Sequence, residues 1–316
     1  MTNIFIAGHN GMVGGAIHRL LLNKPDLNLI TVEKDDLDLR NQAAVSEFFS
    51  MQKIDQVYLC AAKVGGIFAN DNHPVDFLLY NLQIQNNVLH SAYLNSVQKL
   101  LFLGSSCIYP RDAQQPMKED ALLMGALEKT NEAYAVAKIA GIKLCESFNR
   151  QYGLDFRAVM PTNLYGPRDN FDPYSSHVIP GLIRRMYEAH RNGQNSFQIW
   201  GSGDVFREFL YVDDLAKACI LLMDLNKSDF DTRPHLENLH INVGSGAEIR
   251  ISRLAELVKE IVGFRGSLEF DNTRPDGPRR KYLDCSNMNH FGWRPSVNIE
   301  DGLDQTYRWF QKNIVG

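Results

Sequence analysis

The chain contains 316 residues, of which 44% are hydrophobic and 22% are charged, and its formal net charge is −4 at pH 7. This length corresponds to one large or two modest domains with a sizeable core, and this composition is ordinary for a globular enzyme. The negative charge gives no support for a nucleic-acid or anionic-membrane partner, so any anionic ligand must be bound by local positive groups.

Five cysteines stand alone along the chain, at positions 60, 107, 145, 219 and 285. An odd number of cysteines without C-x-x-C spacing favours a reducing compartment and argues against disulfides and structural zinc. The first residues enter a strand pattern instead of a signal-peptide pattern, and no apolar run reaches the ~18 residues needed to cross a bilayer. We therefore expect a cytoplasmic protein without a metal site.

The N-terminal stretch predicts a dinucleotide-binding unit. Residues 3–7 form a short apolar strand pattern, and a G-x-x-G-x-x-G loop and a helix pattern follow. The first glycine allows a tight turn, the second lets the backbone approach a pyrophosphate, and the third lets the helix pack on the strand. The helix N-terminus supplies N–H groups to the phosphates. The predicted cofactor contacts in this loop are Gly8, Asn10, Gly11, Met12, Val13 and Gly14.

The end of the second predicted strand, residues 29–32, should meet the adenosine ribose. Glu33 favours NAD, because a carboxylate accepts hydrogen bonds from ribose hydroxyls, whereas Lys34 favours NADP, because it can pair with a 2′-phosphate. These two signals conflict, so the residues alone leave the cofactor open. Asp38, followed by Leu39, is a candidate contact for the adenine, or else it caps a helix predicted at 41–52.

The third predicted strand, residues 55–62, ends in small residues. Ala61 and Ala62 at its carboxyl end leave room for a dinucleotide, and a flexible loop begins at Lys63. A long helix is predicted at about 74–94. The dinucleotide should therefore lie across the ends of the first and third strands.

A proton-transfer device is predicted on the helix at 131–151. Tyr134 and Lys138 lie one turn apart on one face of this helix. Free tyrosine has a pKa near ~10, and a nearby cation favours the phenolate, so the pair can exchange a proton with a carbonyl or an alcohol. The fourth strand, residues 99–104, delivers Ser105 ahead of this helix, and its hydroxyl can bond a substrate oxygen beside the phenol.

This order of glycine loop, serine, tyrosine and lysine resembles the extended branch of the short-chain dehydrogenase/reductase superfamily, whose C-terminal part binds a nucleotide-sugar. The resemblance implies an α/β protein: a Rossmann-type doubly wound parallel sheet with a smaller, mainly C-terminal α/β substrate domain. We expect an NADP-binding Rossmann domain at 1–164 plus about 208–246, and a nucleotide-sugar-binding domain at 165–207 and about 247–316.

The C-terminal half matches further segments of the superfamily. A strand at 154–160 leads into a loop, 161–167, that resembles the segment passing the nicotinamide into the sugar site. Residues 199–214 resemble the signature W-G-x-G…R-x-F-x-x-V-x-D, in which Arg207 has a planar fork suited to phosphate oxygens. A Gly/Pro loop at 276–284 carries three consecutive cations that suit a diphosphate, although a solvated basic loop explains them equally well. Further helices are predicted at 214–224, 251–262 and 302–310.

Cys107 narrows the choice of reaction. A thiol with a pKa near ~8.5 can take an acidic proton next to a ketone and return one. Inverting a carbon requires a second group on the opposite face, and His177, just before a predicted helix, is the natural partner. The alternatives are a small buried cysteine and a structural histidine.

Six motifs, including Leu103–Pro110, Tyr134–Gly141 and Met160–Pro167, make the chain resemble the GDP-L-fucose synthase family nearly end to end. That family combines 3,5-epimerisation and NADPH-dependent 4-reduction of GDP-4-keto-6-deoxy-D-mannose. The resemblance implies that Cys107 and His177 shuttle protons at the carbons flanking the ketone. It also implies that Tyr134 and Ser105 bond the enolate oxygen, that Tyr134 donates the final proton and that Lys138 tunes Tyr134.

The resemblance also implies two sets of ligand contacts. The additional cofactor contacts are Lys34, Asp38, Leu39, Ala61, Ala62, Lys63, Tyr134, Lys138, Pro161, Asn163, Leu164 and His177. The substrate contacts are Ser106, Cys107, Asn163, Arg185, Trp200, Arg207 and Lys281. NADPH is the implied cofactor, with NADH possible because Asn10 replaces the basic residue that the family commonly has there.

The family is usually homodimeric through the helix carrying Tyr134 and the helix before it, so a homodimer is implied. Three other functions remain open at this point. These are a synthase of a related GDP-deoxyhexose of the colitose type, a redox-neutral NAD-dependent nucleotide-sugar 4-epimerase, and a non-enzymatic dinucleotide-binding regulator. The joint presence of Ser105, Tyr134, Lys138, Cys107 and His177 argues against the regulator.

Overall fold

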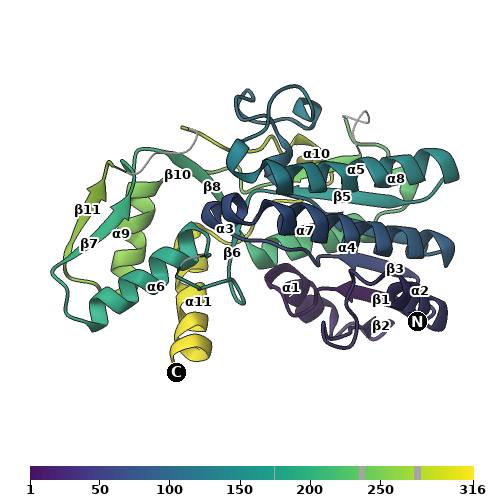
Figure 1. Cartoon of the computed structure of the whole chain (residues 1–316), viewed down its shortest axis with the longest axis horizontal. Coiled ribbons are helices and arrows are strands. Elements are labelled where there is room, and N and C mark those ends of the chain that lie inside the picture. Colours follow the sequence, from purple (N-terminus) through teal and green to yellow (C-terminus); the bar gives the residue numbers. More distant parts are fainter. Residues whose placement is uncertain (174, 235–238, 274–278) are drawn as a thin grey trace.

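The computed structural model describes residues 1–173, 175–234, 239–273 and 279–316. Part of the predicted basic loop, 276–278, lies outside the described residues, and so does position 174. Figure 1 shows a larger body built on one sheet beside a smaller body that contains the C-terminal helix.

The larger body is organised around a six-stranded sheet in the order β2-β1-β3-β4-β5-β9. All of its strand pairs are parallel. The strands are β1 (Thr2–Ala7), β2 (Leu27–Ile30), β3 (Gln56–Leu59), β4 (Lys99–Leu103), β5 (Phe156–Pro161) and β9 (His240–Val243). The chain runs from β1 outward to β2 and then returns to the other side of β1, so a topological switch point lies between β1 and β3. Ligands of such sheets bind outside the carboxyl ends of the strands at this point.

Helices cover both faces of this sheet, as the predicted doubly wound architecture requires. The period-two alternation of β1 sends Ile4 and Ile6 into one core and Phe5 and Ala7 into the other. The first face carries α1 (Met12–Leu21) and α7 (Val212–Asp224), and the second carries α2 (Gln42–Met51), α4 (Pro74–Leu94) and α5 (Glu132–Tyr152). Short elements complete this body: α3 (Ile67–Asn72), α8 (Lys227–Phe230), α10 (Ser286–His290), and the 3-10 turns η1 (Ser106–Ile108), η2 (Glu119–Ala121) and η3 (Lys129–Asn131).

The smaller body packs a third core under two small sheets. One sheet has the order β10-β8-β6, and the other pairs β11 with β7. These elements are β6 (Asn163–Tyr165), β7 (Ser196–Trp200), β8 (Phe206–Tyr211), β10 (Glu248–Arg250), β11 (Ser267–Asp271), α6 (Val178–Arg191), α9 (Ile251–Val262), α11 (Ile299–Phe310) and η4 (Gln311–Val315). Strand β8 faces both bodies, because Leu210 lies in the core under α7 while Phe209 and Tyr211 lie in the third core.

Two local expectations were wrong. The second strand ends at Ile30 instead of residue 32, because its pairing with β1 covers only four residues. The helix predicted at 41–52 is capped by Asn41, whose side chain accepts from the Ala44 N–H, and not by Asp38. Asp38 instead accepts hydrogen bonds from the Arg40 guanidinium, which takes up both of its oxygens.

One buried carboxylate fastens the C-terminal segment to the larger body. Asp214, in the first turn of α7, accepts hydrogen bonds from the Ser296 N–H at 2.8 Å and the Val297 N–H at 2.8 Å. It also accepts from the Ser296 hydroxyl and the Lys217 ammonium.

Within the described ranges, no helix is long and apolar enough to cross a membrane.

Candidate active site

The glycine loop forms a turn that only glycine can make. Gly8 has φ +91°, and a Cβ on it would lie 2.8 Å from the Ala61 nitrogen at the end of β3. A Cβ on Gly14 would lie 2.2 Å from the Gly8 carbonyl oxygen. Helix α1 starts after Gly11 without a side-chain cap, so its first N–H groups are available to a phosphate. The loop therefore fits a dinucleotide pyrophosphate, whereas Val13 contributes only backbone, because its side chain is buried in the core.

A cluster of polar side chains lies beyond the ends of β1 and β2, where the adenosine of a dinucleotide is expected. The Asn10 amide donates to Glu33 at 2.6 Å, and His9 Nε2 lies 3.3 Å from the other Glu33 oxygen. Asp38 pairs with Arg40 at 2.7 Å, and this hydrogen bonding lowers the pKa of Asp38. The pairing leaves Asp38 fewer free lone pairs for an adenine than predicted. Lys34 is exposed on the same segment.

Two other predicted cofactor residues are positioned through their backbone. The Asn81 side chain on α4 accepts from the Lys63 N–H at 2.9 Å and donates to the Lys63 carbonyl at 3.0 Å. The Leu39 carbonyl accepts from the Asn87 amide at 2.9 Å. Helix α4 therefore fixes both loops that border the expected cofactor site.

Ser105, Tyr134 and Lys138 converge at the carboxyl end of β4. The Ser105 hydroxyl lies close enough to the Tyr134 phenol to oppose the rise in its pKa. The Lys138 ammonium donates to the Leu103 carbonyl at 2.8 Å and lies 5.7 Å from the centre of the Tyr134 ring. The predicted serine–tyrosine–lysine group is therefore assembled on β4 and α5.

Burial decides the direction of the pKa shifts of Tyr134 and Lys138. Burial raises the pKa of Tyr134, and it lowers the pKa of Lys138 to about 8. Desolvation disfavours the charged forms of both groups. The phenol therefore keeps its proton at neutral pH and is set up as a donor.

Cys107 lies in the same group, in the turn η1 that follows Ser105. Burial raises the pKa of its thiol, while the nearby Lys281 and Lys138 ammonium groups act in the opposite direction. A thiolate at Cys107 would in turn raise the pKa of Tyr134. The structure thus brings Cys107, Tyr134 with Lys138, and Lys281 together from three separate parts of the sequence.

His177 immediately precedes α6, as predicted, and burial of its ring lowers its pKa, so the imidazole is neutral at neutral pH. The residue nevertheless has an exposed surface, as expected on the wall of an open site. The loop before it reaches the cofactor edge, because the Gly66 N–H donates to the Ser175 carbonyl at 3.0 Å. Helix α3, which begins after Gly66, packs on the turn η3 that leads into the Tyr134 helix.

The segment predicted as a loop at 161–167 joins the two bodies, and its residues 163–165 form the strand β6. Pro161 ends β5, and Leu164 packs partly against the core of the larger body. The Asn163 amide donates to the Glu208 carbonyl at 2.9 Å, which leaves its side-chain oxygen for other contacts. Ser106 is buried within η1.

Arg185 and Trp200 form a stacked pair at the edge of the smaller body. The Arg185 guanidinium lies 4.9 Å from the centre of the Trp200 ring and 5.0 Å from that of Phe197. Trp200 is 57% exposed, so one face of the pair is open to solvent. A planar cation on an open indole suits a flat or anionic ligand.

The three consecutive cations do not act together as expected. Arg280 forms an ion pair with Glu248, and Arg279 is exposed. Lys281 instead lies near Cys107. Burial lowers the pKa of Lys281, and the nearby Arg207 acts in the same direction. Arg207 on β8 and Lys281 are therefore neighbouring cations.

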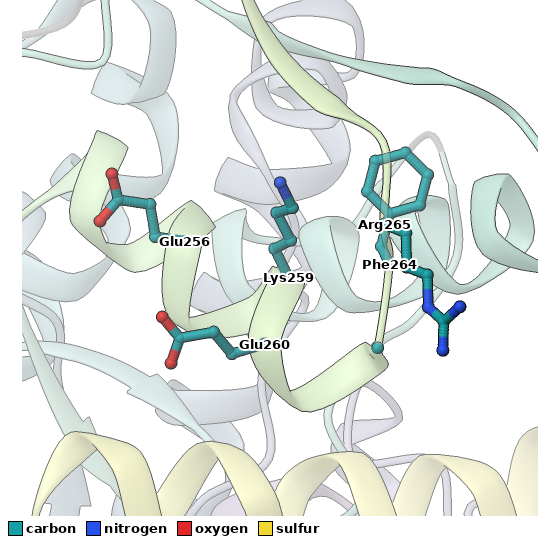
Figure 2. A pocket seen from close by; sticks show the side chains of 6 residues that line it. Glu256, Lys259, Glu260, Phe264 and Arg265 are labelled. Atoms are coloured by element: carbon teal, nitrogen blue, oxygen red, sulfur yellow. The ribbon is translucent and has the colours of Figure 1, made fainter.

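A separate surface hollow lies at the C-terminal end of α9 and contains none of the predicted residues. It is lined by Glu256, Lys259, Glu260, Gly263, Phe264 and Arg265. Figure 2 shows that its charged side chains do not point toward a common centre. The part of the chain that the structure describes has no group of three His, Cys, Asp or Glu residues able to hold a metal ion.

A family model described as the NAD dependent epimerase/dehydratase family matches residues 4–244. The chain belongs to this family. GDP-L-fucose synthase from Escherichia coli (strain K12) is 53% identical over 312 residues, which cover 98% of this chain and 97% of that protein. GDP-L-fucose synthase 1 of Arabidopsis thaliana is 54% identical over 313 residues, covering 99% and 94%. The crystal structure of a GDP-L-fucose synthetase from Naegleria fowleri bound to NADP is 30% identical, with a TM-score of 0.89 over 99% of this chain and 93% of that chain.

These similarities confirm the predicted resemblance and fold class.

Three residues that border the site were absent from the prediction. Arg40 pairs with Asp38 and lies 4.6 Å from the Tyr80 ring centre, Arg168 donates to the His9 carbonyl, and Glu208 joins two loops near Lys281. Arg40 could have been predicted, because it lies only two positions after Asp38. The contacts of Arg168 and Glu208 could not, because their partners lie far away in the sequence.

Proposed function

We propose that this protein is a bifunctional enzyme that converts GDP-4-keto-6-deoxy-D-mannose to GDP-L-fucose by 3,5-epimerisation and NADPH-dependent reduction at C4. The observation that carries this proposal is the grouping of Cys107 with Ser105, Tyr134 and Lys138. A simple reductase needs the last three residues but has no evident need for the thiol. Relatives at about 50% identity over nearly the whole chain bear the name of this activity.

The dinucleotide would be held by the glycine loop, the N-terminus of α1 and the ends of β1 and β3. NADPH, when bound, supplies the hydride for C4. Lys138 would hold the nicotinamide ribose, in keeping with its position beside Tyr134. The solved relative from Naegleria fowleri that contains NADP supports this choice of cofactor.

Tyr134 and Ser105 would act on the substrate's ketone oxygen. Both are hydrogen-bond donors next to each other, so they can stabilise the negative oxygen of an enolate. Tyr134 then gives its proton to the C4 oxygen as the alcohol forms. The raised pKa of Tyr134 suits this role, because an acid must still carry its proton at the working pH.

Cys107 and His177 would exchange protons with the carbons on either side of the ketone. Near neutral pH the thiol carries a proton and the imidazole does not, so one group can donate while the other accepts. The ketone acidifies both carbons, because the charge left by each proton spreads onto its oxygen. Inversion follows when removal and return take place on opposite faces.

The diphosphate of the substrate would meet Arg207 and Lys281, and Arg185 with Trp200 would bind farther along the nucleotide. Ser106 and Asn163 would complete the sugar contacts. We further propose that 1–164 with about 208–246 binds the cofactor, and that 165–207 with about 247–316 binds the nucleotide-sugar. The position of β8 between two cores supports this division.

We also propose a cytoplasmic homodimer. Helices α4 and α5 pack closely on each other and expose apolar side chains, including Leu79 at 45% and Val136 at 42%. A second copy would cover these side chains. Free thiols at all five cysteines suit a reducing compartment.

The test is to follow reduced-nicotinamide absorbance with GDP-4-keto-6-deoxy-D-mannose and to identify the product. Wild-type protein should form GDP-L-fucose in proportion to the cofactor oxidised. Cys107→Ser should bind cofactor normally but incorporate much less solvent deuterium into the sugar, whereas Tyr134→Phe should lose reduction and keep some exchange. No oxidation by the wild type, or unchanged deuterium exchange in Cys107→Ser, would contradict the proposal.

A further inference from the structure

A chain of buried hydrogen bonds lies behind the turn that carries Cys107. Tyr109, the residue after η1, is 3% exposed, and its hydroxyl oxygen lies 2.5 Å from Asn242 Oδ1 and 3.1 Å from His240 Nε2. The Asn242 amide nitrogen donates to the Met117 carbonyl, which leaves the amide oxygen to accept from Tyr109. The Tyr109 oxygen then accepts from His240, whose ring is neutral because burial lowers its pKa to about 3. The Tyr109 hydroxyl therefore has a single arrangement.

The turn itself is held by long hydrogen bonds. The Ile108 nitrogen lies 3.3 Å from the Ser105 carbonyl oxygen, and the Tyr109 nitrogen lies 3.5 Å from the Ser106 carbonyl oxygen. The Cys107 nitrogen lies 3.5 Å from the Ser105 hydroxyl oxygen. Protein N–H···O bonds usually measure about 2.7–3.2 Å, so these three are weak. The position of Cys107 therefore depends on the anchor at Tyr109, whose hydroxyl is bound more tightly.

The same amide also reaches the segment that carries Lys281. The Met117 carbonyl, which accepts from the Asn242 amide at 2.9 Å, also accepts from the Asp284 N–H at 2.8 Å. The Met117 N–H donates at 2.9 Å to the carbonyl of Tyr282, the residue after Lys281. Asn242 is thus fixed between η1 and the segment that follows Lys281.

A buried carboxylate holds the backbone of Asn242. Glu119, which is 3% exposed, accepts from the Asn242 N–H at 3.0 Å and from the Asn287 amide at 3.1 Å. Asn242 is 0% exposed, so neither it nor Tyr109 can touch a substrate. Their effect on the reaction must pass through η1 and Lys281.

We propose that Tyr109 and Asn242 are positioning residues, which hold Cys107 and Lys281 in the mutual placement that proton exchange at the sugar requires. This inference deepens the proposed function and rests on it. Tyr134 lies on α5, which supplies none of the hydrogen bonds described above. Loss of the Tyr109 hydroxyl should therefore slow proton exchange and leave cofactor binding unchanged.

Tyr109→Phe tests this inference, because it removes one hydroxyl and keeps the ring. Solvent-deuterium incorporation into GDP-4-keto-6-deoxy-D-mannose would be measured with NADP⁺ in place of NADPH, so that exchange is followed without reduction. Its rate should fall about tenfold, because a displaced proton-transfer group reacts much more slowly. The dissociation constant of NADPH, measured from nicotinamide fluorescence, should not change.

Tyr211→Phe is the matched control. Tyr211 is also 3% exposed, and its hydroxyl donates to the Gln305 side-chain oxygen at 3.0 Å, in the core of the smaller body. The two variants should unfold at similar urea concentrations, because each loses one buried hydroxyl bonded to an amide. Tyr211→Phe should nevertheless exchange deuterium at the wild-type rate.

The outcomes separate this inference from the proposed function. Slower exchange in Tyr109→Phe alone, at a stability matched by Tyr211→Phe, supports the inference. Equal exchange rates in the two variants, or a Tyr109→Phe protein that does not fold while Tyr211→Phe does, would reduce Tyr109 to a structural contact and overturn it. Exchange by the wild type would then leave the proposed function intact. If the wild type itself exchanges no deuterium, both fail.

Discussion

Glu208 makes a prediction that links stability to substrate binding. Its carboxylate, fully buried on β8, accepts from the Gly246 N–H at 2.8 Å and from the Leu283 N–H at 3.0 Å. Glu208→Ala would leave the buried Leu283 N–H without an acceptor, at roughly 1–3 kcal/mol, whereas the N–H of the exposed Gly246 can bond to water. We therefore expect a loss of about 1–3 kcal/mol in the free energy of unfolding. Glu208→Gln should lose roughly half as much, because its amide still offers one oxygen.

The hydrogen bond between the Leu283 N–H and Glu208 should also influence substrate binding, because Lys281 lies two residues before Leu283. A loosened segment would hold Lys281 less firmly near Arg207, so the KM for the GDP-sugar should rise several-fold while the affinity for the cofactor stays the same. Urea unfolding and steady-state kinetics measure the two effects. Glu47→Gln on exposed α2 is the control and should change stability by less than about 0.5 kcal/mol. A Glu208→Ala variant that loses under 1 kcal/mol with unchanged KM would refute this reasoning.

Two further predictions concern charged groups. Asp214→Asn should lose about 1.5–3 kcal/mol by urea unfolding. The Ser296 and Val297 N–H groups donate to the same oxygen and can keep it, but the amide nitrogen that replaces the other oxygen can no longer accept from the Lys217 ammonium. Burial raises the pKa of Asp214, but the hydrogen bonds that it accepts outweigh burial and lower this pKa overall. The contribution of Asp214 to the free energy of unfolding should therefore be complete above pH ~4 and be lost as the pH falls below 3.8. Equal stability of the variant and the wild type at pH 7 would contradict this prediction. The reduction rate should fall as the pH rises through about 8, where the buried Lys138 loses its charge. Lys138→Arg should shift this alkaline limb of the pH–rate profile to higher pH. A limb that stays in place would show that another group causes it.

Local pattern was enough to predict most of the fold. The G-x-x-G-x-x-G loop is a contiguous signal, and the strict requirement for glycine at Gly8 and Gly14 follows from contacts within the same turn and with the adjacent strand. The Tyr134–Lys138 spacing is equally local, because helical geometry alone places both on one face. The ends of strands were harder, since β2 ends where its pairing with β1 ends.

Tertiary partners and desolvation could not be predicted in the same way. Glu33 was recognised as a ribose candidate, but its fixation by Asn10 joins residues 23 positions apart. Arg280 belongs to the run of three cations that suits a diphosphate, yet it pairs with Glu248, 32 positions away. The sequence shows that a cation follows Tyr134 by one turn, but not that burial shifts both pKa values against ionisation.

That desolvation has a consequence for the direction of the reaction. An enzyme that oxidises an alcohol needs a phenolate to take the proton, whereas one that reduces a ketone needs a phenol to give it. Burial raises the pKa of Tyr134 and so keeps the phenol protonated, while Lys138, at a pKa of about 8, still carries its charge at neutral pH. The residual positive charge then favours the phenolate that remains after donation. The same burial that opposes a base at Tyr134 thus prepares it as an acid, which is the state that reduction of a keto-sugar requires.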